Sequence, residues 1–137
     1  MKIMIDTNVI LDVLLEREAF VDESYKVLSM CEEHRVDGFV SASAVTDIYY
    51  IVRKYTHSTE IAYNAIGKLL EIVKVCNVTN NDILTAFQIR AKDFEDCIVS
   101  VCAKSNSCDY IITRNIKDFK SFDIETLAPI EFISMVE

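Results

Sequence analysis

The chain opens with Lys2-Ile3-Met4-Ile5-Asp6-Thr7-Asn8-Val9, in which a short apolar run stops at an acid. The apolar run predicts a strand over residues 2–5, and the apolar spacing from Val9 to Leu15 predicts a helix directly after it. A second amphipathic stretch around residues 25–31 predicts another helix. The chain therefore begins with one strand and two helices, and its first acid lies where the strand ends.

The same alternation continues to the end of the sequence. Further strands are predicted at residues 38–40, 75–78, 110–113 and 124–127. Helices follow residues whose side chains can cap free backbone N–H groups, namely Ser41 or Ser43, Ser58 or Thr59, Thr79, and Asp93. Pro129 favours the first turn of a terminal helix. Strands that alternate with helices predict a three-layer α/β fold around a mostly parallel sheet.

The composition narrows the functional classes. A length of 137 residues supports one hydrophobic core, so residues 1–137 are expected to form a single domain. Apolar residues make up 51% of the chain, which excludes a disordered protein. With two glycines and one proline, no glycine-rich loop that cradles phosphates can be built. The net charge of −8 argues against strong non-specific binding of RNA.

Targeting signals, cysteines and histidines exclude further classes of function. No stretch approaches the roughly 18 uncharged apolar residues of a membrane span, so a cytoplasmic protein is expected. The five cysteines are odd in number and lack CxxC spacing, and we interpret them as small apolar core residues. The chain has only His34 and His57, which disfavours sites built on several histidines. Catalysis, if there is any, must therefore depend on carboxylates.

Short polar side chains follow strand ends or helix starts in four separate segments. They are Asp6, Asp47, Asp96, Asn115 and Asp118. Because ligands bind beyond the carboxyl ends of parallel strands, we expect these side chains to gather at one edge of the sheet. Gathered carboxylates repel one another unless a cation neutralises them, and Mg²⁺ or Mn²⁺ prefers oxygen ligands of this kind. The pattern predicts a divalent metal site.

A metal site of this composition suits phosphodiester hydrolysis. A bound ion lowers the pKa of its water and stabilises charge on the phosphate, so no covalent nucleophile is required. Spacing alone leaves a simpler alternative open, because acids also favour helix N-termini, where the helix dipole stabilises them.

Three ordered segments resemble the PIN-domain family. They are residues 3–9, then Asp93-Phe94-Glu95-Asp96 with the following helix, and Tyr110-Ile111-Ile112-Thr113-Arg114-Asn115-Ile116-Lys117-Asp118-Phe119. Their order and separation extend the resemblance over nearly the whole chain. The resemblance implies a parallel sheet of four or five strands and a metal-dependent ribonuclease that uses Mg²⁺ or Mn²⁺. In this family such an enzyme is most often the toxin of a bacterial toxin–antitoxin pair related to VapC, with frequent homodimers and an antitoxin partner.

The resemblance also implies roles for individual residues. Asp6 matches the family's first acid and would bind the metal directly, with Thr7 and Asn8 supporting it through hydrogen bonds. Asp96 matches the acid that opens the following helix and would be the second principal ligand.

Two positions depart from the family's pattern. Asp47 stands where the family usually has Glu, so its carboxylate begins one methylene shorter and would reach the metal through water. Asn115 stands where many members have a fourth acid, and the loss of one negative ligand would either weaken ion binding or shift that role to the nearby Asp118. Both departures reduce the set of carboxylates that can bind a metal directly.

Basic and aromatic residues raise the question of RNA contact. A rim of Arg114, Lys117 and Lys120 beside the carboxylates would hold phosphates, whereas a scattered solvated surface explains the same residues. Tyr49 and Tyr50 are interpreted mainly as packing residues, with base stacking as the alternative. The apolar excess between residues 21 and 73 fits either a dimer or antitoxin groove or a large core.

Two other functions remain as alternatives. One is a PIN-like module that binds RNA or protein without cutting, which Asn115 and the short Asp47 favour. The other is a phosphatase with Asp6 as covalent nucleophile, but Asn8 replaces the acid that this chemistry needs two residues later.

Overall fold

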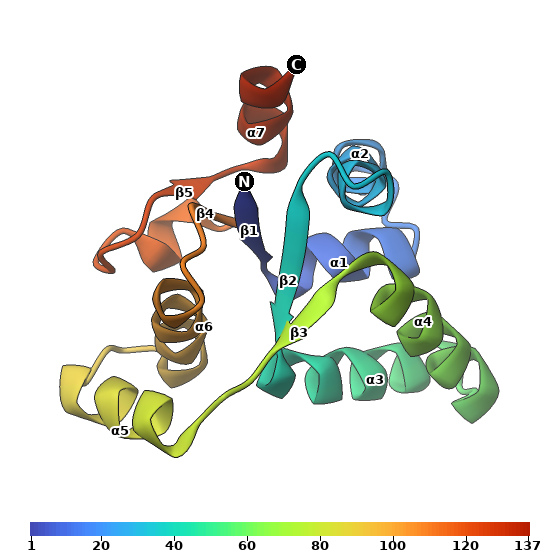
Figure 1. Ribbon diagram of the computed structural model, residues 1–137. Helices are drawn as coiled ribbons and strands as arrows, with labels where there is room; N and C mark the ends of the chain where they lie inside the picture. Colours follow the sequence, from blue (N-terminus) through green and yellow to red (C-terminus); the bar gives the residue numbers. More distant parts are fainter.

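The computed structural model describes residues 1–137, and Figure 1 shows a central sheet with helices on both sides. The strands are β1 (Lys2–Ile5), β2 (Asp37–Ser41), β3 (Lys74–Cys76), β4 (Tyr110–Ile112) and β5 (Thr126–Leu127). The helices are α1 (Thr7–Leu14), α2 (Val21–Glu32), α3 (Ala42–Thr56), α4 (Thr59–Ile72), α5 (Asn80–Ile89), α6 (Phe94–Ser105) and α7 (Pro129–Val136), with a 3₁₀ helix, η1, at Ile116–Phe119.

All five strands are parallel and lie in the order β3-β2-β1-β4-β5. The central strand β1 pairs with β2 on one side and with β4 on the other, so that Ile3 lies beside both Gly38 and Tyr110. The predicted three-layer α/β fold is confirmed, and the sheet is entirely parallel. Consecutive connections run outward in opposite directions from β1, which makes the gap between β1 and β4 the topological switch point.

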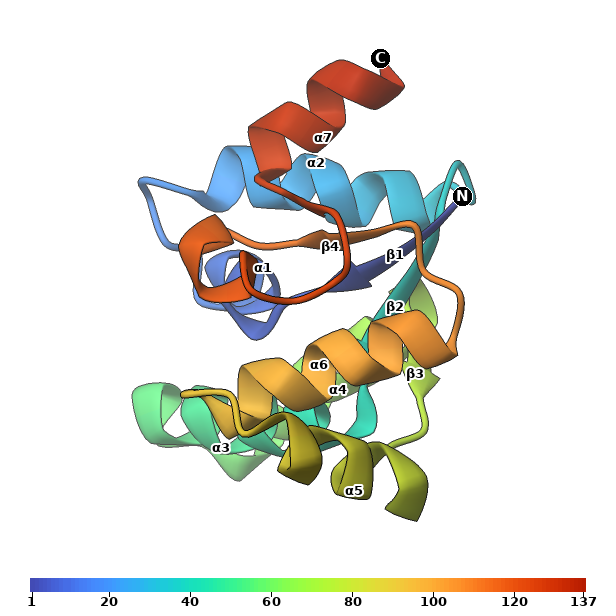
Figure 2. The ribbon, with the colours of Figure 1, turned by 90° about the vertical axis from the view of Figure 1, so that its left-hand side faces the viewer.

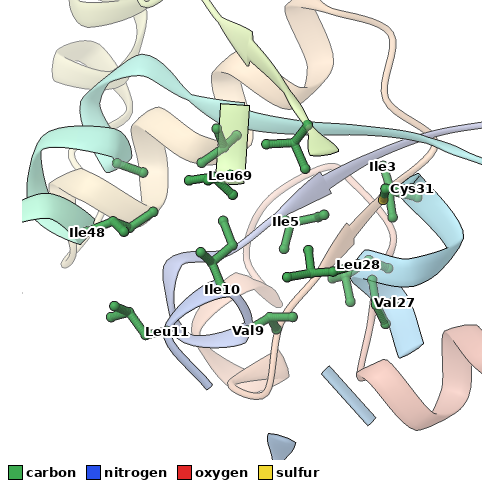
Figure 3. Close-up of a cluster of buried hydrophobic side chains, with 14 of the residues drawn as sticks. Ile3, Ile5, Val9, Ile10, Leu11, Val27, Leu28, Cys31, Ile48 and Leu69 are labelled. Atoms are coloured by element: carbon green, nitrogen blue, oxygen red, sulfur yellow. The ribbon is translucent and has the colours of Figure 1, made fainter. Parts of the chain in front are cut away.

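Side chains alternate between the two faces of the sheet, as the pleat requires. Ile3 and Ile5 of β1 pack into the larger core with α1, α2, α3, α4 and α7, and Figure 3 shows part of this cluster. Met4 points the other way, into a smaller core with α5, α6 and η1. Figure 2 views the molecule from the side of α5 and α6. The apolar excess between residues 21 and 73 supplies much of the larger core.

Local capping explains where the helices begin. Ser41 rather than Ser43 caps α3, and Ser58 rather than Thr59 caps α4, each by accepting a hydrogen bond from a backbone N–H. Thr79 and Asp82 form the reciprocal capping box of α5, and Asp93 caps α6. Pro129 occupies the first turn of α7, as predicted.

The strand boundaries differ from the predicted ones in two places. The predicted strand at 75–78 is β3, which ends at Cys76 because the chain then turns toward the Thr79 cap of α5. The predicted strand at 124–127 contains only the two residues of β5. The 3₁₀ helix η1 was not predicted, because its four residues are too few for an amphipathic period.

The remaining expectations concern cysteines and membranes. Four of the five free cysteines are buried and Cys108 is half-buried, in agreement with their interpretation as apolar packing residues. Gly38 of β2 lies directly under α2, where a Cβ atom would come within 2.5 Å of the Cys31 Sγ. None of the helices combines the length and the apolar character that crossing a membrane would require.

Candidate active site

Asp6 lies at the switch point, between the end of β1 and the start of α1. Its backbone N–H donates to the carbonyl oxygen of Ile112 at 2.9 Å, which extends the pairing of β1 with β4 by one residue. Its carboxylate Oδ1 accepts a hydrogen bond from the backbone N–H of Thr7 at 2.9 Å. Strand pairing and helix capping together therefore fix the position of this carboxylate.

The second carboxylate oxygen of Asp6 is held by two side chains. The Thr113 hydroxyl donates to Oδ2 at 2.8 Å, and the Asn8 amide Nδ2 donates to the same oxygen at 3.3 Å. Burial nevertheless raises the pKa of Asp6, against the lowering effect of the Thr113 and Thr7 hydrogen bonds. The nearby charges of Asp118 and Asp93 add to the rise.

Thr113 was not singled out by the sequence reasoning. The register that places Ile112 beside Ile5 carries the next residue of each strand, Thr113 and Asp6, to the same point of the sheet. The position of Thr113 directly after the apolar run at 110–112 is the only sequence signal for its role. That signal can be used only when the order of the strands is known, and the local sequence does not provide this order.

Asp96 lies in the first turn of α6, where its backbone N–H donates to the Asp93 carboxylate at 2.9 Å. Partial burial, and then the charges of Asp93, Asp6 and Asp118, raise the pKa of Asp96 to about 6. Because Asp96 responds to the charges of both Asp6 and Asp118, the three predicted site acids lie within electrostatic reach of one another. The structure thus brings together Asp6 at the end of β1, Asp96 of α6 and Asp118 of η1.

A hollow of about 470 Å³ opens beside these acids. Asp93, Asp96, Lys117 and Asp118 line it, together with four other residues. Asp118 and Lys117 are exposed side chains of η1. Asn115 is also exposed, and its backbone N–H donates to the Thr113 hydroxyl at 3.0 Å. Asn115 therefore joins the network through its backbone.

Asp47 lies beside Glu95, the residue that precedes Asp96 in α6. Burial, followed by a hydrogen bond with Asp47 and the charges of Asp47, Asp93 and Asp96, raises the pKa of Glu95 to about 7. Asp47, Glu95 and Thr7 line a separate hollow of about 370 Å³. Glu95 was missed by the sequence reasoning, because an acid in the first turn of a helix is already explained by the helix dipole.

Arg114 differs from its expected role as an RNA contact. Its guanidinium binds the fully buried carboxylate of Asp12 through Nε at 2.7 Å and Nη2 at 3.0 Å. Its planar group also lies 3.8 Å from the centroid of the Phe20 ring. The guanidinium is thus engaged by Asp12, and the Arg114 backbone N–H donates to the Asn8 Oδ1 at 3.3 Å.

The donor set fits a hard divalent cation by its chemistry. Asp6, Asp96 and Asp118 offer only carboxylate oxygens, and their mutual repulsion is the condition that a bound cation would relieve. In this structure no three acidic, histidine or cysteine side chains are already drawn together as a ready-made ligand group. The acids are neighbours, and coordination would require a further approach of their side chains.

Comparison with known proteins identifies the family of the chain. The model of the PIN domain family matches residues 2–117. The chain belongs to the PIN domain family. The three segments that carry the resemblance, residues 3–9, 93–96 and 110–119, all begin within the matched range.

Several relatives resemble this PIN domain over most of its length. Ribonuclease VapC1 of Aquifex aeolicus is 28% identical over 136 residues, which cover 96% of this chain and 92% of that protein. The crystal structure of VapBC2 from Rickettsia felis, bound to a promoter DNA fragment, has a TM-score of 0.74 at 16% identity and covers 93% of this chain and 98% of that chain.

A third relative is named for its substrate. VapC20 of Mycobacterium tuberculosis, described as a Sarcin-Ricin loop cleaving toxin, has a TM-score of 0.66 at 14% identity. The match covers 80% of this chain and 86% of that chain. At these identities the solved structures establish a shared fold, with the order of strands and helices that carries the acids of this PIN domain.

Proposed function

We propose that this PIN domain is a metal-dependent endoribonuclease and the toxin of a bacterial toxin–antitoxin pair. The observation that carries the proposal is the proximity of Asp6 and Asp118 to Asp96: burial raises the pKa of Asp96 to about 6, and the charges of Asp93, Asp6 and Asp118 add to the rise. A site that concentrates repelling carboxylates at a switch point is suited to a cation and a phosphate rather than to structural stability. The ribonuclease relatives of similar length support the same reading.

Different residues of the site would bind the metal, orient a metal ligand and contact the RNA. Asp6, Asp96 and Asp118 would hold Mg²⁺ or Mn²⁺, which supplies a water of lowered pKa and stabilises charge on the scissile phosphate. Thr113 and Asn8 orient the Asp6 carboxylate through their hydrogen bonds to Oδ2. Lys117, exposed in the same hollow, is available to a phosphate oxygen of the RNA.

Cleavage of RNA tests this proposal directly. Purified protein is expected to cut single-stranded RNA or a structured RNA such as tRNA with added Mg²⁺ or Mn²⁺, and to lose that activity in chelator. Asp6→Asn and Asp96→Asn are each expected to abolish cleavage without unfolding the protein. Asp123→Asn is the matched control, because it removes one exposed carboxylate that pairs with Lys104 and does not line the hollow of Asp96. Full activity in chelator, or unchanged cleavage by both site variants, would refute the mechanism.

A second candidate function is an RNA- or protein-binding module without nuclease activity. The amide of Asn115 in place of a fourth acid and the short side chain of Asp47 favour it, because each weakens the family's usual set of acids. Calorimetric titration with Mn²⁺ separates the two functions. Saturable binding that Asp6→Asn abolishes supports the nuclease, and the absence of measurable affinity supports the binding module.

The proposed toxin function also implies protein partners. We propose an antitoxin protein and a homodimer in the cytoplasm, since solved relatives are named as VapBC complexes. The exposed apolar side chains of α5, including Leu84 and Phe87, offer a surface for such contacts. Light scattering of the purified protein, alone and after co-expression with the product of an adjacent reading frame, measures both assemblies.

A further inference from the structure

The exposed side of α3 carries two adjoining hollows. The first is the hollow of Asp47, Glu95 and Thr7, and the second, of about 580 Å³, is lined by Arg53, His57 and Thr59. Tyr50 and Lys54 line both of them. The two hollows therefore meet at Tyr50 and Lys54, and together they are called the groove along α3, which leads from Asp47 and Glu95 to the C-terminal end of the helix.

The outer half of this groove is basic although the whole chain is acidic. Arg53 and Lys54 are exposed, and neither takes part in an ion pair, because the ion pairs of the molecule join Asp12 to Arg17 and Arg114 and join Lys104 to Asp123. No acid lines the outer hollow. The helix dipole favours cations at a helix C-terminus, but it does not account for a groove that continues to the carboxylates.

Tyr50 gives the groove an aromatic surface at its midpoint. Its side chain is 57% exposed, while its ring packs against Tyr49 at a centroid distance of 5.0 Å. Tyr49 is held in turn by Tyr63 of α4, also at 5.0 Å. An exposed ring that is anchored from one side is a platform on which an unpaired base can stack, and cations beside such a platform contact the backbone of a single strand.

We propose that the groove along α3 binds the single-stranded RNA segment next to the cleaved bond, with a base stacked on Tyr50 and phosphates bound by Lys54 and Arg53. This inference rests on the proposed ribonuclease function and adds the place at which the substrate is held. Lys54 follows Asp47 by seven residues, which is about 10 Å along the helix axis. The bound segment therefore lies close to Asp47 and Glu95, in a hollow that Thr7, the residue next to Asp6, also lines. The groove takes over the role that the sequence suggested for Arg114, whose guanidinium is engaged by Asp12.

RNA binding without cleavage tests the groove. The affinity of a short single-stranded RNA is measured by fluorescence anisotropy in chelator, at several salt concentrations, so that no result depends on catalysis. Tyr50→Ala is expected to weaken binding by roughly 5- to 150-fold, whereas Tyr50→Phe retains the ring and the affinity. Lys54→Ala is expected to lower the slope of log affinity against log salt by about 0.7. Lys68→Ala is the matched control, because it removes an exposed lysine of α4 that lines neither hollow.

The outcomes separate this inference from the function on which it rests. If the wild-type protein binds and cleaves RNA but Tyr50→Ala and Lys54→Ala behave like Lys68→Ala, the groove is overturned and the nuclease stands. If these variants keep their RNA affinity but lose binding to an acidic protein partner, the groove serves protein docking, which also overturns the inference. If the wild-type protein neither binds nor cleaves RNA, both proposals fail.

Discussion

Asp12 and Arg114 form a two-point ion pair across 102 residues of sequence, with distances of 2.7 Å from Nε to Oδ2 and 3.0 Å from Nη2 to Oδ1. The Asp12 side chain is fully buried and also accepts a hydrogen bond from the Ser24 hydroxyl at 3.0 Å. The pair ties α1 and α2 to the segment after β4. Because the backbone of Arg114 holds the Asn8 amide, this tie reaches the surroundings of Asp6.

Removal of the Asp12 carboxylate leaves the guanidinium of Arg114 without its charged partner. Asp12→Ala is expected to lower the free energy of unfolding by about 3–5 kcal/mol, the cost of breaking a buried ion pair from one side. Urea denaturation measures the change. Asp123→Asn breaks the solvent-exposed pair with Lys104 and is expected to leave the urea midpoint nearly unchanged. Equal midpoints for the two variants would contradict the structural role of the buried pair.

The Thr113 hydroxyl lowers the pKa of Asp6, whereas burial raises it. Thr113→Val removes the donor while keeping the shape of the side chain, so the pKa of Asp6 is expected to rise further. The carboxylate then ionises only at higher pH. The measurement is a metal-free NMR titration of the Asp6 carboxyl carbon. Ser100→Ala, which removes a buried hydroxyl that bonds within α6, is the control and is expected to leave this titration unchanged.

Gly38 has no room for a side chain beneath α2. A Cβ at this position would lie 2.5 Å from the Sγ of Cys31 and 3.2 Å from a methyl carbon of Val73. Gly38→Ala is therefore expected to destabilise the protein by about 1–3 kcal/mol through overpacking. Cys31→Ala in the same chain removes the sulfur and is expected to recover part of that loss. A double-mutant cycle from thermal or urea unfolding measures the coupling, and strict additivity would argue against the contact.

Asp82 makes the stability of α5 depend on pH. Hydrogen bonds from Thr79, Ser105 and Cys102 hold the pKa of Asp82 below its ordinary value of 3.8. A carboxyl whose pKa is lowered on folding stabilises the protein above its unfolded pKa, and this contribution is lost as the pH falls through the folded pKa. Asp82→Asn is therefore expected to cost stability at neutral pH and progressively less below pH 3.8. Urea unfolding at a series of pH values measures the difference, and a pH-independent difference would contradict this origin.

The sequence predicted the elements of the fold well, because local signals decide them. Apolar runs gave β1 and β4, and the side chains of Thr79, Asp93 and Pro129 gave helix starts that the structure confirms. Adjacent candidates such as Ser41 and Ser43 could not be separated, because only the backbone geometry decides which hydroxyl accepts the N–H. The order of the strands depends on long-range packing, which local periodicity does not encode.

The candidate site was predicted in part for the same reason. Asp6, Asp96 and Asp118 are neighbours as expected, since each follows a strand or opens a helix at one edge of the sheet. Thr113 was missed because its partner Asp6 lies in another segment, and Glu95 because the helix dipole already explains an acid in the first turn of a helix. The engagement of Arg114 was also missed. Arg114 stands near acids in the sequence, which suggests a phosphate contact. The buried Asp12 that binds it lies in the middle of the apolar helix α1, 102 residues away, so the sequence gives no sign of the pair.

The outermost strands of the sheet, β3 and β5, contain three and two residues. Each edge of the sheet therefore exposes only a few unpaired N–H and C=O groups, which are too few for a strand of another chain to pair with. The sheet is thereby protected against edge-to-edge pairing, so an assembly of two copies is expected to use side-chain contacts and not backbone pairing.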